Sequence, residues 1–304
     1  MKTKILNFQK NGALGILQIS TPEINTFNYI TFSKALQDKL IEIKEISDVG
    51  SVNNIFVINR SNEFVFFMDG DILIGAKQNR VLNTSVLLAP ESKTEIPVSC
   101  IESGRWRFSS PGFRSTNHSV SAFIRKDKAK DVTDNLKKSQ RHCADQRKVW
   151  DNVEKAHILF SESSPTSNFT DIYENRRHDF DGFIRNLKPF SEANGIAVFI
   201  RNNLINLDIF NRLDVYQEYF PKLLRGTMME TCNLRESDRP LERAEAEYKI
   251  MEFLDRYDNL QFDIHPGVGT GTEKRFETRE MTGFELIYEN HLIHITALNL
   301  NPRY

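Results

Sequence analysis

The sequence contains few cysteines, and none of them forms a paired motif. The three cysteines, Cys100, Cys143 and Cys232, lie far apart and include no C-x-x-C pair. An odd number of widely spaced cysteines argues against a disulfide scaffold and against a cysteine zinc site. We therefore expect reduced thiols and a cytoplasmic protein.

Long apolar runs and an excess of one charge are also missing. No stretch approaches the ~20 apolar residues that a membrane helix needs, and residues 1–15 contain no apolar core of the signal-peptide kind. Lysine and arginine total 40 against 41 aspartate and glutamate. This balance gives no reason to expect a membrane or a nucleic acid as a partner.

Several catalytic signatures are absent as well. There is no P-loop, G-x-S-x-G or kinase signature, and none of the seven histidines stands at a zinc-site spacing. We therefore predict no metal site. The glycine-rich run 267–272 follows His265–Pro266 and precedes a strand-like segment, which excludes a Rossmann loop. An anion-binding turn that uses backbone N–H groups is the functional interpretation that remains for it.

The residues that are abundant indicate a mixed fold. The 22 phenylalanines favour a β-rich core with aromatic filling. Apolar periodicity predicts strands at 14–20 and 52–59, and helices at 31–46, 214–224 and 241–257. Because strands and helices do not alternate regularly, we predict an α+β fold of mostly antiparallel sheets built from hairpins, with several packed helices.

The later part of the chain predicts two hairpins and a helical insertion. Residues 195–205 and 283–293 each consist of an apolar strand, an asparagine-containing turn and a second apolar strand. Apolar residues at heptad spacing predict one long helix near 127–160, and a second helix is predicted at 171–187. Residues 108–119 are predicted as a loop. We expect a single domain over 1–304 with a helical insertion at about 127–190.

The stretch from Glu63 to Trp106 brings apolar sequence and specific polar residues together. Asp69-Gly70 lies between apolar runs and predicts a hairpin turn. A buried polar group without a hydrogen-bond partner costs about 1–3 kcal/mol of stability. Protein groups or a ligand must therefore pair with the polar residues that come after this turn. Cations suit a phosphate or carboxylate, and amides suit a base or ribose edge. The polar set that follows is Lys77, Gln78, Asn79, Arg80 and Asn83.

A second polar set lies on the next predicted strand. Cys100 and Glu102 would point to the same face, and a neighbouring carboxylate raises the pKa of a thiol. Cys100 is therefore better interpreted as a small buried residue than as a nucleophile. Glu102 is a general base, a ribose-hydroxyl acceptor, or the ion-pair partner of Arg80 or Arg105. Trp106 is either a core residue or a stacking surface for a planar ligand.

These blocks resemble a known family. The sequences GAKQNR at 75–80, PVSCIE at 97–102 and GRW at 104–106, with QRKVW at 146–150, are similar to the ARG and rhodanese-phosphatase-superfamily-associated protein family. ARG there stands for ADP-ribosylglycohydrolase, and the likeness covers nearly the whole chain. The resemblance implies a role beside enzymes that make or remove ADP-ribose, in bacterial NAD-linked or defence systems. It supplies no established reaction.

The leading hypothesis places an ADP-ribose- or NAD-derived ligand between the two polar sets. Arg80 or Lys77 would hold the diphosphate, and Glu102 would accept a hydrogen bond from a ribose. If the ligand is turned over, Glu102 is the predicted base and Arg105 the group that steadies developing charge. The remaining predicted ligand contacts are Gln78, Asn79, Asn83, Cys100 and Trp106.

Two alternatives remain open. In the first, the protein is a structural or interaction component whose KQNR residues form an internal polar network and whose helices at 127–160 and 241–257 dock partners. Burial of Arg80 and Glu102 against protein groups, without a cavity beside them, would favour this alternative. In the second, the protein is a thiol enzyme that uses Cys100.

Overall fold

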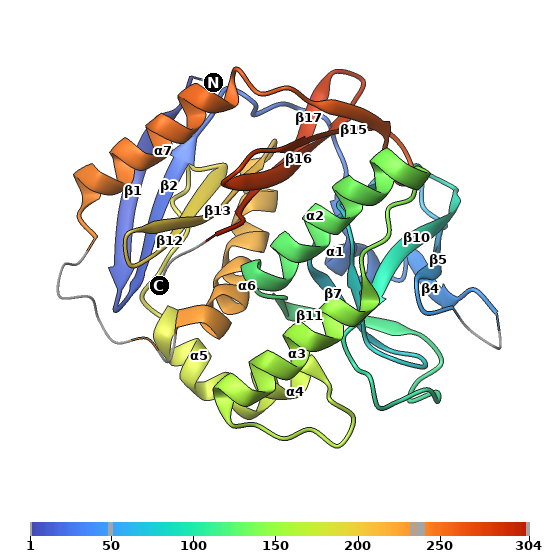
Figure 1. The fold of residues 1–304 in the computed structure, drawn as a ribbon. Coiled ribbons are helices and arrows are strands. Elements are labelled where there is room, and N and C mark those ends of the chain that lie inside the picture. Colours follow the sequence, from blue (N-terminus) through green and yellow to red (C-terminus); the bar gives the residue numbers. More distant parts are fainter. Residues whose placement is uncertain (1, 48–50, 232–233, 235–240, 302–304) are drawn as a thin grey trace.

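The computed structural model describes residues 2–47, 51–231, 234 and 241–301. Its largest sheet has eight antiparallel strands in the order β1-β2-β12-β13-β17-β16-β15-β14 (Figure 1). Its strands are β1 (Lys4–Asn11), β2 (Leu14–Ser20), β12 (Gly195–Ile200), β13 (Asn203–Phe210), β14 (Asp263–Pro266), β15 (Thr272–Glu277), β16 (Met281–Tyr288) and β17 (His291–Asn299).

Both faces of this sheet are covered, which explains the unbroken apolar runs of its central strands. Side chains alternate between the faces along a strand. In β12, Ile196 and Val198 join a core shared with α6 (Leu213–Thr231). Ala197 and Phe199 join a second core beneath α7 (Arg243–Tyr257).

The two predicted hairpins are confirmed. Strand β12 pairs with β13, and β16 pairs with β17, both antiparallel. Because β13 also pairs with β17, the two hairpins lie side by side in the sheet. The turns place Arg201, Glu289 and Asn290 at φ values of 50°, 47° and 67°, and asparagine tolerates this left-handed region better than most residues.

Two smaller sheets form the other half of the fold. A six-stranded sheet has the order β11-β7-β8-β10-β5-β4, and a three-stranded sheet has the order β3-β6-β9. They enclose a third core together with α1 (Phe32–Gln37). Their strands are β3 (Ile30–Thr31), β4 (Ile41–Glu45), β5 (Asn54–Asn59), β6 (Val65–Phe67), β7 (Asp71–Gly75), β8 (Arg80–Leu82), β9 (Val86–Leu88), β10 (Lys93–Cys100) and β11 (Phe113–Ser119).

The Asp69-Gly70 turn is present, but the hairpin predicted around it is wrong. Strand β6 pairs with β3 and β9, whereas β7 pairs with β8 and β11. Gly70 has a φ of 84°, and Asp71 N donates to Met68 O at 3.1 Å. The turn therefore carries the chain from one sheet into another, and the local sequence does not distinguish this from a hairpin.

The predicted α+β class is confirmed. The sheets are mostly antiparallel, and four helices follow one another between residues 122 and 184. In the described part of the chain, no helix is long and apolar enough to cross a membrane. These four helices are α2 (Ala122–Ser139), α3 (Gln146–Phe160), α4 (Phe169–Asn175) and α5 (Arg177–Ile184).

The segment expected as one helix over 127–160 is two helices. Helix α2 ends at Gln140, which adopts the left-handed conformation at a φ of 55°. Helix α3 begins after Asp145, whose side chain accepts hydrogen bonds from the N–H groups of Arg147 and Lys148. The heptad spacing continued across the break and concealed it, although Asp145 is a typical N-cap residue.

Three other segments also differ from their predictions. The helix expected at 31–46 ends near Asp38, and Ile41 and Ile43 then bury alternate side chains as part of β4. The predicted loop at 108–119 contains β11, and the helix predicted at 171–187 is divided between α4 and α5. In each case a pairing or packing partner distant in sequence decides the structure.

Candidate functional site

Arg80 of the KQNR set is buried against other protein groups. Its side chain has no exposed surface, and Nη1 donates to Gln78 Oε1 at 2.9 Å and contacts Cys100 Sγ. Nη2 donates to Ser51 O at 3.2 Å, and Glu45 Oε1 lies 3.6 Å from Nη2. Both terminal nitrogens of the guanidinium that would hold a diphosphate are thus bonded within the protein, and Nε is buried without a hydrogen-bond partner among the described residues.

Glu102 is held just as firmly. Its carboxylate accepts from Arg105 Nη2 at 2.6 Å and Nε at 2.8 Å, from Thr166 Oγ1 at 2.8 Å and from Asn79 N at 3.1 Å. Burial raises the pKa of Glu102, but the hydrogen bonds from Arg105 and Thr166 outweigh it and leave the pKa below its ordinary value. A carboxylate stabilised in this way is a weak base.

The amides of the first polar set also have partners. Asn79 Oδ1 accepts from Gly75 N at 2.9 Å, and its Nδ2 donates to Asn168 Oδ1 at 3.0 Å. Asn83 Oδ1 accepts from Ser99 Oγ at 2.8 Å, and its Nδ2 donates to His142 O at 3.3 Å. For these residues the geometry favours the internal polar network, and the predicted ligand contacts stay a prediction.

Cys100 has the environment of a structural cysteine. Burial raises the pKa of its thiol to about 12, although the nearby Arg80 works in the opposite direction. The backbone of Cys100 is fixed by Gln146, whose Oε1 accepts from Cys100 N at 2.7 Å and whose Nε2 donates to Cys100 O at 2.8 Å. A thiol that stays protonated at neutral pH is a poor nucleophile.

Trp106 lies at the surface above two cations. Its side chain is 45% exposed, and its ring centroid lies 5.5 Å from both Lys77 Nζ and the guanidinium carbon of Arg80. Phe108, 55% exposed, covers Lys77 at 5.2 Å. The core interpretation of Trp106 therefore does not apply, and its stacking on a planar ligand stays a prediction.

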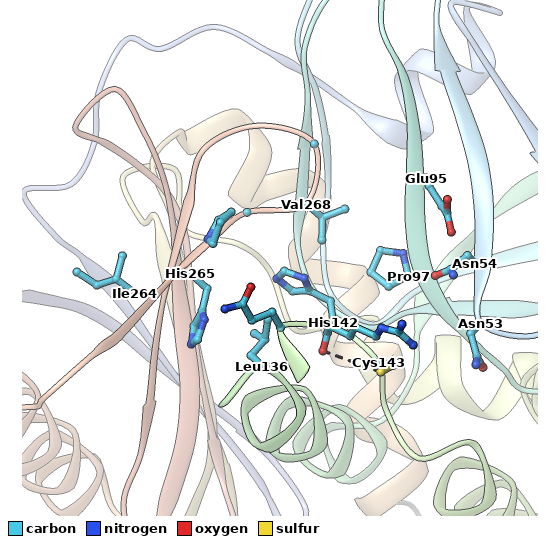
Figure 2. A pocket seen from close by; sticks show the side chains of 15 residues that line it. Asn53, Asn54, Glu95, Pro97, Leu136, His142, Cys143, Ile264, His265 and Val268 are labelled. Atoms are coloured by element: carbon cyan, nitrogen blue, oxygen red, sulfur yellow. Dashed lines mark hydrogen bonds between the residues drawn. The ribbon is translucent and has the colours of Figure 1, made fainter. Parts of the chain in front are cut away.

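A cavity of about 940 Å³ lies close to this network, between the two large sheets (Figure 2). This volume falls within the range of small-molecule sites. The hydrogen bonds described above, from Asn83 to His142 and from Cys100 to Gln146, hold in place the α2–α3 connection that lines the cavity. Three parts of the chain line the cavity: residues 53–54 with Glu95 and Pro97, Leu136 with residues 140–143, and residues 264–269.

The glycine-rich turn supplies one side of this cavity. Gly269 and Gly271 have φ values of 82° and 90°, and a Cβ on Gly269 would lie 2.5 Å from Leu87 O. Gly267 N donates to Gly271 O, and Thr270 N donates to Leu87 O. Within the described residues, the N–H groups of Val268 and Gly269 make no hydrogen bond. Unpaired backbone donors of this kind suit an anion.

The other side of the cavity carries a positive charge. Arg141 is exposed and lines the cavity, and its guanidinium forms no ion pair with any residue that the structure describes. The adjacent Asn53 and Asn54 contribute amides to the same wall. The cavity thus combines a cation, amides and backbone donors, as a phosphate-bearing ligand requires.

Comparison with known proteins identifies the family. The sequence profile of the ARG and rhodanese-phosphatase-superfamily-associated protein domain, ARPP-1, matches residues 2–298. The chain belongs to the ARPP-1 family. The description of the ARPP-1 family links it to ARG-type enzymes and hence to ADP-ribose pathways. Searches of curated proteins and of solved structures gave no match.

Sequence reasoning about this ARPP-1 chain missed most of the cavity lining. Arg141 and His142 were placed inside a continuous helix, whereas they lie in the α2–α3 connection. The sequence predicts an anion-binding turn at 267–272. Its glycines are the one local feature that could have indicated the cavity. Its opposite wall could not be inferred, because the lining residues of β10 and β5 lie roughly 170 and 210 positions away in sequence.

One cluster in this ARPP-1 chain has the donor set of a metal site. Ligand atoms of Asp69, Asp208 and His294 lie within 4.8 Å of one another, and all three residues are buried. Arg125 already binds both carboxylates, donating to Asp69 Oδ1 at 2.9 Å and to Asp208 Oδ1 at 2.6 Å. Since a guanidinium neutralises these carboxylates, they fit an internal ion-pair network better than a metal site.

Proposed function

We propose that this protein binds an ADP-ribose- or NAD-derived nucleotide in the cavity between the sheets. The observation that carries the proposal is the presence of two kinds of anion-binding group in one cavity. The N–H groups of Val268 and Gly269 and the guanidinium of Arg141 all lack a hydrogen-bond or ion-pair partner among the residues that the structure describes. The association of the ARPP-1 family with ADP-ribosylglycohydrolase supports this class of ligand.

Each part of the cavity has a role in this proposal. The glycine-rich turn and Arg141 would share the diphosphate, because backbone donors and a guanidinium together can satisfy several phosphate oxygens. Asn53 and Asn54 would hydrogen-bond ribose hydroxyls or the base edge. Asn83 and Cys100 then act indirectly, because their hydrogen bonds to His142 O and to the Gln146 side chain hold the 140–146 connection against β8 and β10.

Calorimetric titration with ADP-ribose, NAD and AMP tests the proposal. We expect the wild type to bind ADP-ribose and NAD, and Arg141→Ala to weaken binding by about tenfold or more, since a charge-assisted hydrogen bond contributes about 1.5–3 kcal/mol. Arg147→Ala is the matched control, because Arg147 is an exposed arginine outside the cavity lining. Failure of the wild type to bind any of the three would refute the proposal.

A non-catalytic interaction role is the second candidate. The internal pairing of Arg80 and Glu102 favours it, and helix α3 exposes Ile158 (71%) and Leu159 (53%) at its end. Light scattering and a pull-down with an ADP-ribosylation-related enzyme would test it, comparing the wild type with Ile158→Asp. Stable association that Ile158→Asp abolishes, in a protein that binds no nucleotide, would establish this role instead.

A further inference from the structure

A histidine and a buried carboxylate meet at the edge of the same cavity. His142 lines the cavity (Figure 2). Its Nε2 lies 3.4 Å from Oε1 of Glu273 on β15. Glu273 has no exposed surface. The pair therefore joins a residue open to the cavity with a residue deep in the protein, which is the arrangement that orients a catalytic imidazole.

The carboxylate of this pair is fixed from behind. Thr84 Oγ1 donates to Glu273 Oε1 at 2.7 Å, and Arg275 Nε donates to Oε2 at 2.7 Å. Arg275 is itself fully buried, and its Nη2 donates to Thr84 Oγ1 at 2.8 Å. Glu273 thus cannot swing away from His142 without breaking a buried network.

The electrostatics set the tautomer of His142. Burial raises the pKa of Glu273, but Arg275, His142 and Thr84 lower it further, to about 2. An ionised carboxylate beside Nε2 favours a proton on that nitrogen, which leaves the lone pair on Nδ1. Nε2 is buried and makes no hydrogen bond with a described residue, so Glu273 acts on it through its charge at 3.4 Å. Nδ1 also makes no hydrogen bond with a described residue, which leaves it to accept a proton from a molecule in the cavity.

We propose that His142 is the general base of a hydrolase and that its substrate is an NAD-type dinucleotide, cleaved between ribose and nicotinamide. This inference rests on the proposed binding of such a nucleotide in the same cavity. Nδ1 takes a proton from water while the water oxygen bonds to the anomeric carbon of the ribose. The electron pair of the carbon–nitrogen bond leaves with nicotinamide, giving ADP-ribose, neutral nicotinamide and one proton.

The choice of leaving group follows from the cavity's other histidine. His265 lies on β14 in the same lining, and burial, followed by the charge of Arg275, lowers its pKa below the ordinary value. His265 is therefore neutral at pH 7 and is a poor proton donor. Nicotinamide departs from a pyridinium and needs no proton, whereas an alcohol or amide leaving group does. The other charged groups on the lining are Glu95 and Arg141.

Nicotinamide release from NAD, followed by chromatography, tests the assignment. The wild type should release nicotinamide, and His142→Ala should lower kcat by about 100-fold, the typical contribution of a general base. Calorimetric binding of NAD should change by less than about threefold. Free imidazole should restore turnover to His142→Ala, an effect that a structural role for His142 would not produce.

Glu273 is assigned as a positioning residue and has its own readout. Glu273→Gln keeps an acceptor but removes the charge that fixes the tautomer of His142, so kcat should fall about tenfold while the KM for NAD stays within about threefold. Glu154→Gln, which removes an exposed carboxylate of α3 outside the cavity lining, is the control and should leave both kcat and KM unchanged.

The two levels of the proposal fail separately. NAD that binds without releasing nicotinamide would overturn the base assignment and leave the binding site standing. Absence of NAD binding would overturn the site itself. If the His142→Ala protein has the melting temperature of the wild type and releases nicotinamide at the wild-type rate, another residue is the base.

Discussion

At the scale of single residues, burial decides which polar groups are available for chemistry. Arg80 and Glu102 form hydrogen bonds with protein partners such as Gln78 and Arg105, whereas Arg141 and His142 line a cavity. A buried ion pair contributes little net stability compared with apolar packing, but removing one partner is costly. Arg80 and Glu102 are therefore held in a network of protein groups, and the proposed ligand contacts lie elsewhere, on the cavity lining.

The cysteines provide a residue-scale prediction. Cys100 is fully buried with a raised thiol pKa, whereas Cys143 is partly exposed on the cavity lining. Under native conditions at pH 8, iodoacetamide should alkylate Cys143 at least ten times faster than Cys100, because the reactive species is the exposed thiolate. Peptide mass spectrometry measures both rates in one sample. Equal labelling would contradict the burial described here.

The sequence predicted which residues need partners, but not which partners they have. That Glu102 pairs with Arg105 was among the stated options, and it holds. Thr166, which donates to Glu102, and Asn168, which accepts from Asn79, lie more than 60 positions away. No periodicity or spacing connects such residues, because only the tertiary fold brings them together.

At the scale of elements, the break between α2 and α3 shapes the cavity. Gln140 ends one helix and Asp145 caps the next, so the 140–145 connection lines the cavity instead of continuing along a helix. The hairpins at 195–205 and 283–293 were predictable because their turns and strands are adjacent in sequence, whereas the Asp69-Gly70 turn joins strands of different sheets. The helix at 31–46 was not, because Ile41 and Ile43 follow the alternation of a strand that pairs with β5.

Gln146 gives a prediction for this connection. Its side chain makes two hydrogen bonds with the backbone of Cys100, at 2.7 and 2.8 Å. Gln146→Ala should lower the free energy of unfolding by about 1–3 kcal/mol, because it leaves a buried donor and acceptor unpaired, and it should also weaken nucleotide binding. Arg147→Ala, one position along the helix, should change stability by less than about 0.5 kcal/mol. Urea unfolding measures both variants, and equal losses would contradict the bracing role.

At the scale of the whole molecule, buried charge joins the sheets. Arg125 on α2 binds Asp69 beside the six-stranded sheet and Asp208 and Thr296 in the eight-stranded sheet. Arg125→Met would leave two buried carboxylates without their cation. The free energy of unfolding should fall by about 3–5 kcal/mol. Lys138→Met, at an exposed position of the same helix, is the control. A loss no larger than the control's would show that these ion pairs do not join the two halves.

Acid should weaken the molecule through Glu273. The pKa of Glu273 is about 2 in the fold, below its ordinary value of 4.5, so the ionised form stabilises the folded state. That contribution is complete above pH 4.5 and is lost as the pH falls towards 2. The stability difference between the wild type and Glu273→Gln should therefore narrow over this interval. A constant difference in urea unfolding experiments across the interval would contradict the assignment.

The class of fold was predictable, whereas the position of the cavity was not. Apolar periodicity and turn residues are local signals, and they were sufficient for an α+β molecule with antiparallel hairpins. The cavity walls come from residues 53–54 with Glu95 and Pro97, from Leu136 with residues 140–143, and from residues 264–269, and they meet only in the folded chain. Among the lining segments, only the glycine-rich turn at 267–272 has a local sequence pattern that indicates anion binding.

The most direct measurement is a crystal structure of the protein soaked with ADP-ribose. We expect difference density in the cavity, with the diphosphate within hydrogen-bond distance of the Val268 and Gly269 N–H groups and of the Arg141 guanidinium. Density beneath Trp106 beside Lys77 and Arg80, or a cavity that stays empty at saturating ligand, would contradict it.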